Sequence, residues 1–212
     1  MNRRFSCVAT DEGIVHLYLV FRLVSRDSFS SGLHTVPPEV QCARRKSSRK
    51  ATMKPQTRPA ASPKQQLDSF LAKYDPAIAT FARRVLAKLR KRLPGAVEMV
   101  YDNYNALVIG FGPNDRPSLA IFSVVLFPRW VILYFLQGAS LPDLQRRLQG
   151  GGKVGRHIRL EGLSTLDDPY VQDLMNLALH RAKAPLDPKN RRQLIIKSIS
   201  AKQRPRRPVS GQ

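Results

Sequence analysis

The sequence predicts an α+β domain with two amino-terminal helices, an antiparallel sheet of about four to six strands, and a carboxyl-terminal helix packed on the sheet. Two observations predict it. Capping signals and a 3.6-residue apolar period indicate helices near both ends of the domain. Residues 96–138 between them are instead rich in β-branched and aromatic residues and are broken by turn signals. A chain of 212 residues can hold one such core plus tails.

Two helices are predicted at the start of the domain. The first begins at Ser62, with Pro63 at the first helical position and Gln65 completing an S-x-x-Q capping box. Asp75-Pro76 ends it and caps a second helix with an apolar stripe over residues 78–93. A solvated surface explains the charges opposite that stripe, and contact with phosphates or a membrane surface is the functional alternative. These charges belong to Arg83, Arg84, Lys88, Arg90 and Lys91.

Four strands in antiparallel succession are predicted for residues 96–138. The stretch 119–136 is apolar enough to raise a transmembrane alternative, but Pro128 and Arg129 lie near its middle. An arginine at a bilayer centre costs about 2.5–3.5 kcal/mol, so a hairpin turning at Pro128 is expected instead. Because both hairpin strands are apolar on both faces, we expect helices on one side of the sheet and further helices or a second subunit of a homodimer on the other.

The glycine-rich stretch 149–162 contains the spacing G-x-G-x-x-G but does not predict a dinucleotide site. A short helix from Pro142 precedes the glycines and a strand is expected after them, whereas a dinucleotide site needs the reverse order. Residues 152–160 also resemble the G-x-x-G loop of the KH fold, although no capping signal supports a following helix. Lys153, Arg156 and Arg159 could bind an anion with the loop's backbone N–H groups.

The last predicted helix is capped by Asp168-Pro169, and the domain is expected to span residues 62–188. Residues 189–212 are predicted as a basic segment with one strand or helix and a tail. Residues 1–61 are predicted to be an extension that is disordered or wrongly included, with Met53 as the translated start. Cys7 and Cys42 both lie in this extension, which suits a cytoplasmic protein without disulfides.

Lysine and arginine outnumber aspartate and glutamate by 36 to 15, and this excess favours anionic partners. Most of it lies outside the predicted domain. Residues 1–61 carry 11 basic and 4 acidic side chains, residues 62–188 carry 17 and 11, and residues 189–212 carry 8 and none. No nucleophile elbow, no cysteine–histidine pair within the domain and no H-E-x-x-H pattern is present, so the sequence favours a binding protein over an enzyme.

Three stretches resemble the bacterial YdhG-like domain, a family of unknown function loosely grouped with frataxin-like iron chaperones. They are LPGAVEMVYDNYNALVIGFG, FPRWVILYFLQG and LQGGGKVGRHIRL. The resemblance implies a small α+β domain and makes iron a possible cargo. Glu98 and Asp102, four residues apart on one strand and therefore on one face, are the weak candidates for a shared cation.

We therefore expect a cytoplasmic binding or carrier protein for a metal such as iron or for a small anion, with no membrane partner. The candidate ligand contacts are Glu98, Tyr101, Asp102, Tyr104, Lys153, Arg156 and His157. The alternative is a nucleic-acid-binding module that uses the basic helix, the loop of residues 152–160 and the basic tail.

Overall fold

The computed structural model describes residues 61–207 and shows a six-stranded sheet with helices, so the predicted α+β class is confirmed. The strand order is β5-β4-β3-β2-β1-β6. The predicted extension of residues 1–61, its two cysteines and the Met53 start lie almost wholly outside the described residues. Within these residues, no helix has both the length and the apolar character needed to cross a membrane.

Helices α2 (Pro63–Ala72) and α3 (Pro76–Arg92) begin where their capping signals predict. The Ser62 side chain and the Gln65 backbone N–H form one half of a capping box, and the Gln65 side chain accepts from the Ser62 N–H in return. At the start of α3, the Asp75 carboxylate accepts from Ala77 N at 2.8 Å. Both helices bury their apolar sides in one core cluster with the sheet.

Five strands follow one another in antiparallel pairs: β1 (Val97–Asp102), β2 (Leu107–Gly112), β3 (Phe122–Leu126), β4 (Val131–Phe135) and β5 (Arg156–Leu160). The predicted hairpin at Pro128 is confirmed, with Phe127 N donating to Trp130 O at 2.9 Å. Three short 3₁₀ helices complete this region: η1 (Pro117–Leu119), η2 (Gly138–Ser140) and η3 (Leu163–Leu166).

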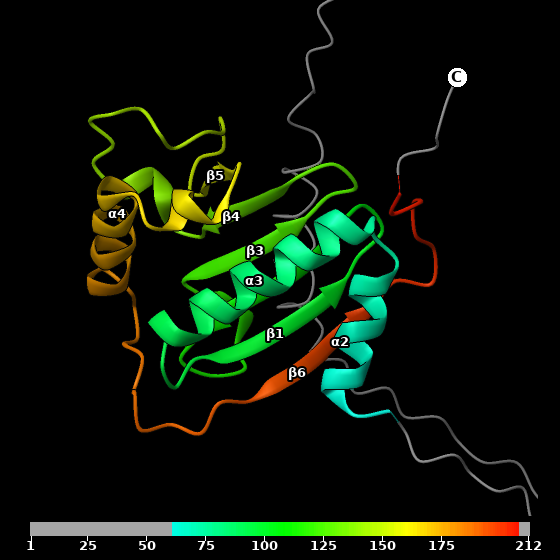
Figure 1. Ribbon diagram of the computed structural model, residues 1–212. Helices are drawn as coiled ribbons and strands as arrows, with labels where there is room; N and C mark the ends of the chain where they lie inside the picture. Colours follow the sequence, from blue (N-terminus) through cyan, green and yellow to red (C-terminus); the bar gives the residue numbers. More distant parts are fainter. Residues whose placement is uncertain (1–60, 208–212) are drawn as a thin grey trace, which may run out of the picture.

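Strand β6 (Leu194–Ile199) pairs with β1 in parallel, so the sheet is mixed and the prediction of a purely antiparallel sheet is wrong. The chain reaches β6 through helix α4 (Pro169–His180) and the segment after it, which run outside the sheet and return to its other edge (Figure 1). A parallel neighbour needs such a crossover. The sheet therefore continues beyond residue 188.

Figure 1 shows α3 lying across one face of the sheet, with α2 near its β1–β6 edge and α4 at the opposite side. Side chains from all three helices join the core cluster on that face. The other face carries a second buried cluster of nine residues, each at most 7% exposed. Successive side chains of β1 point alternately to these two faces, and this alternation decides which face each candidate ligand residue occupies.

The prediction of a short helix from Pro142 is wrong, because no helix forms there. The carboxylate of Asp143 accepts backbone N–H groups from Arg147 at 2.9 Å and Leu148 at 2.6 Å, which closes a turn instead. An aspartate side chain offers the backbone this alternative to helical hydrogen bonds. Arg146, inside the turn, has a positive φ of 53°.

Candidate functional site

Glu98 and Asp102 lie on the same face of β1, as predicted, and this face is turned toward the helices. Val100 between them belongs to the core cluster under α2 and α3. Both carboxylates are buried, with Glu98 1% and Asp102 0% exposed. A buried carboxylate is stable only when it is paired and hydrogen-bonded, so its partners determine what it can do.

Glu98 is held by a guanidinium from α3. Arg90 Nε and Nη2 donate to the two carboxylate oxygens at 2.8 and 2.7 Å, which is the bidentate geometry of a strong charged pair. The hydrogen bond to Glu98 raises the pKa of Arg90 above its usual value. Arg192, just before β6, donates to the backbone oxygen of Arg90 at 2.8 Å. Two arginines from different segments, Arg90 and Arg192, therefore lie at this end of β1, and Arg90 neutralises Glu98.

Asp102, at the other end of β1, is held by two cations. Lys73 Nζ, at the end of α2, donates to Oδ2 at 2.7 Å, and Arg206 Nη2 donates to Oδ1 at 3.0 Å. Arg206 is itself buried, and its guanidinium also donates to the backbone oxygens of Asn103 and Tyr104. The carboxylate therefore anchors both α2 and the carboxyl-terminal segment to β1.

These pairs leave neither carboxylate available to a cation. Among residues 61–207, no three acidic, histidine or cysteine side chains lie close enough to hold a metal. An iron(II) site needs several oxygen or imidazole ligands around one point. Glu98 and Asp102 are instead separate structural anchors, each neutralised by the protein's own cations.

The two tyrosines of the candidate site do not join these carboxylates. Tyr101 lies on the opposite face of β1, in the second buried cluster, because successive side chains of a strand point to opposite faces and Tyr101 is next to Asp102. Its burial raises the pKa of its phenol to about 12. Tyr104 lies beyond the end of β1, is 46% exposed, and has the Arg204 guanidinium 5.8 Å from its ring centroid.

The loop residues Lys153, Arg156 and His157 are far from β1. Four strand spacings separate β5 from β1, or about 19 Å at 4.8 Å per strand. Arg156 Nη1 folds back onto the backbone oxygens of Gly152 and Gly155, at 2.7 Å for Gly155. His157 pairs across the sheet with Tyr134 and faces the second cluster, opposite to Arg156. The structure therefore does not bring the predicted ligand contacts together.

Gly150, before β5, is explained by its backbone conformation and not by a bound ligand. Gly150 has a φ of 109°, in the left-handed region that favours glycine. A strand and not a helix begins at Arg156, so neither the dinucleotide nor the KH arrangement is present.

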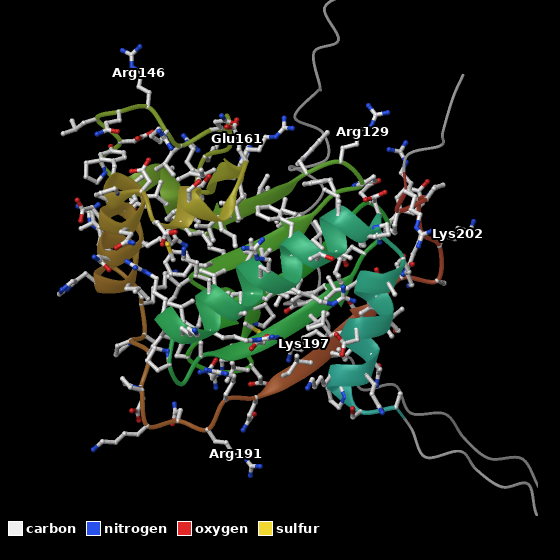
Figure 2. All side chains as sticks on the ribbon, in the orientation of Figure 1. Arg129, Arg146, Glu161, Arg191, Lys197 and Lys202 are labelled. Carbon is white, nitrogen blue, oxygen red and sulfur yellow. The ribbon has the colours of Figure 1, made fainter. Side chains whose placement is uncertain are left out.

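Much of the basic side of α3 is paired within the protein. Arg83 lies 4.0 Å from Asp68, Lys88 pairs with Asp167, and Arg90 holds Glu98. Arg84 and Lys91 are exposed, and the described residues offer them no ion pair. Figure 2 labels five cations that belong to other parts of the molecule, so the positive charge is not confined to this helix; they are Arg129, Arg146, Arg191, Lys197 and Lys202.

Sequence reasoning missed the group that gathers at the carboxyl end of β1. Five cations lie on the two segments that converge there, the end of α2 and residues 200–207: Lys73, Lys202, Arg204, Arg206 and Arg207. Arg207 donates to the backbone oxygens of Tyr74 and Ala72 at 3.3 and 3.2 Å, at the end of α2. Gln203 accepts from Lys73 at 2.9 Å and donates to the Asp102 backbone oxygen at 3.4 Å. The only sequence signal was the basic run after the apolar LIIKSIS stretch.

Comparisons of this chain with protein-family models, with curated proteins and with solved structures find no match.

Proposed function

We propose that this chain is a small binding protein for an anionic ligand, which it contacts at the carboxyl end of β1. One observation carries the proposal. Among residues 61–207, Asp102 is the only carboxylate that forms an ion pair with any of the five cations gathered there, and its partners are Lys73 and Arg206. Asp102 is buried beneath these two partners, and the other three cations, Lys202, Arg204 and Arg207, are exposed. The surplus positive charge therefore faces outward.

The buried pair makes this charge an ordered surface. Ser200 N donates to the Asp102 backbone oxygen at 2.8 Å, and Arg204 N donates to the Tyr104 backbone oxygen at 2.9 Å. The segment that carries Lys202 and Arg204 is thus hydrogen-bonded along the end of β1. Cations held in place before binding lose less conformational entropy when a ligand arrives.

An anionic ligand suits the structure better than iron does. The two carboxylates that could have shared a metal ion are each engaged by guanidinium or ammonium groups at 2.7–3.0 Å. A divalent cation would have to displace these partners and enter a region already rich in positive charge. The frataxin-like part of the family resemblance is therefore not carried into the proposal.

Membership of the YdhG-like family remains part of the proposal, and so does a cytoplasmic location. The α+β architecture of residues 61–207 supports the first. The second is supported by the cysteines, because Cys7 and Cys42 are the two in the chain and residues 61–207 contain neither. A homodimer through the apolar sheet face stays a prediction.

Calorimetric titration with sodium tripolyphosphate tests the proposal. We expect saturable binding that weakens as salt is added. Replacing Lys202 and Arg204 together by glutamine should weaken it about tenfold, since each exposed ion pair contributes up to about 1 kcal/mol. The matched control replaces Arg146 and Arg191 by glutamine. Both lie away from the carboxyl end of β1, and this variant should bind as the wild type does.

Two results would overturn the proposal. One is the absence of tripolyphosphate binding at low salt. The other is an equal loss in both double variants, which would mean that the total charge and not this surface attracts the anion. Anaerobic titration with iron(II) is the companion measurement, and stoichiometric binding of iron(II) would restore the metal carrier in place of the anion binder.

A further inference from the structure

An exposed aromatic ring stands among the cations at the carboxyl end of β1. Among residues 61–207, the exposed large apolar side chains are Tyr104, Leu144 and Ile199, at 46%, 89% and 54%. Two of these three lie at this same end, because Ile199 pairs with Asp102 and Tyr104 follows two residues later. These two apolar side chains are therefore found at the end of the sheet where Lys202, Arg204 and Arg207 are also exposed.

The ring of Tyr104 is held in a defined place. Its backbone oxygen accepts from Arg204 N at 2.9 Å and from Arg206 Nη1 at 3.4 Å. The guanidinium of Arg204 lies over the ring, 5.8 Å from its centroid, at a distance typical of a cation–π contact. With this contact made, nearly half of the residue remains exposed to solvent.

We propose that Tyr104 stacks on a base of a single-stranded nucleic acid whose phosphates contact Lys202, Arg204 and Arg207. This rests on the proposed anion-binding function and narrows its ligand to one class. Proteins that hold single strands combine a positively charged track with aromatic side chains on which bases stack. A bare phosphate uses only the cations, whereas this surface offers both components within a few residues.

A single strand fits better than a duplex. Bases in a duplex are stacked on one another, and a protruding tyrosine reaches a base face only where the strand is open. The site has one exposed ring, so we expect little preference for sequence, because every base has a face that can stack. The cations should add affinity that falls with rising salt.

Fluorescence anisotropy with the full chain tests this proposal. The two probes are labelled oligothymidylate about ten nucleotides long and an abasic strand of the same length and charge. The wild type should bind oligothymidylate more tightly. Tyr104→Ala should weaken that binding about tenfold and leave the abasic strand unaffected, because loss of one stacking contact costs about 1–3 kcal/mol, and 1.4 kcal/mol corresponds to tenfold. Tyr104→Phe, which keeps the ring, should bind as the wild type does.

Leu144→Ala is the matched control, since it removes an exposed apolar side chain from a distant loop and should change nothing. The possible failures are distinguishable. Equal wild-type affinity for the two strands would overturn base stacking while the anion-binding function stands. No binding of either strand, together with no tripolyphosphate binding, would overturn both. An equal loss for both strands in Tyr104→Ala would show that the ring only positions Arg204, and would also overturn stacking.

Discussion

Arg206 forms an ion pair with Asp102 across 104 positions of the chain, with Nη2 and Oδ1 3.0 Å apart. Both side chains are at most 3% exposed. This contact joins the basic carboxyl-terminal segment to the centre of the fold, between α2 and the end of β1. The same side chain therefore bears on stability and on the position of the cations that we propose bind an anion.

Replacing Arg206 by alanine should destabilise the protein by about 3 kcal/mol. Removing one partner of a buried ion pair leaves the other charge uncompensated, which typically costs about 3–5 kcal/mol, and Lys73 still neutralises Asp102 in part. Urea unfolding followed by circular dichroism measures the change. Lys202→Ala is the control, because this side chain is exposed. Similar stabilities of the two variants would contradict a structural role for the pair.

Two truncated chains should show which residues after β6 contribute to stability and to anion binding. A chain ending at Ser200 keeps β6 and the hydrogen bond from Ser200 to Asp102 but loses Lys202, Gln203, Arg204, Arg206 and Arg207. We expect it to unfold at lower urea concentration and to lose tripolyphosphate binding. A chain ending at Arg207 keeps every contact of this segment described above and should match the full-length protein in both measurements.

The elements that could be predicted from the sequence are those set by local chemistry. The cap at Ser62, the cap at Asp75 and the turn at Pro128 each depend on residues within a few positions of one another. The helix expected from Pro142 failed for an equally local reason, since the Asp143 side chain takes the backbone N–H groups that a helix would need. This competition between a side-chain turn and a helix becomes clear from the sequence only when the two structures are compared for the same residues.

The candidate site was predicted poorly because its contacts are distant in sequence. Nothing near Asp102 indicates that Lys73 and Arg206 will neutralise it, and a basic tail reads the same whether it is solvated or docked. The grouping of Tyr101 with Glu98 and Asp102 is different, since strand alternation alone places Tyr101 on the other face. That error could have been avoided from the sequence.

Gly155→Ala should destabilise the protein by about 1–3 kcal/mol, the usual cost of overpacking a buried position. A Cβ atom there would lie 1.7 Å from Tyr134 Oη and 2.3 Å from Tyr134 Cζ, so the ring or the loop must shift. Gly152→Ala is the matched control in the same loop, because its nearest neighbour would be Gly155 O at 3.7 Å, an ordinary contact. Thermal unfolding of the two variants should differ clearly. Equal melting temperatures would contradict the close packing of Gly155 on Tyr134.

The stability of the protein should fall between about pH 10 and pH 12, partly because of Tyr74. Its phenol donates to Leu126 O at 3.0 Å and accepts from Leu107 N at 2.9 Å, and burial raises its pKa from 10.0 to about 12. The unfolded chain therefore releases this proton at lower pH than the folded chain does. The stabilisation is complete below about pH 10 and is lost as the pH rises to about 12.

Tyr74→Phe should make this loss of stability smaller. A shift of one pKa unit corresponds to about 1.4 kcal/mol, so the difference in unfolding free energy between pH 9 and pH 12 should shrink by about 2–3 kcal/mol. The variant loses two hydrogen bonds at every pH, so the pH dependence and not the absolute stability is the measurement. Tyr104→Phe removes a surface phenol and is the control. An unchanged dependence in Tyr74→Phe would show that this buried phenol does not resist ionisation, and would contradict its place between β2 and β3.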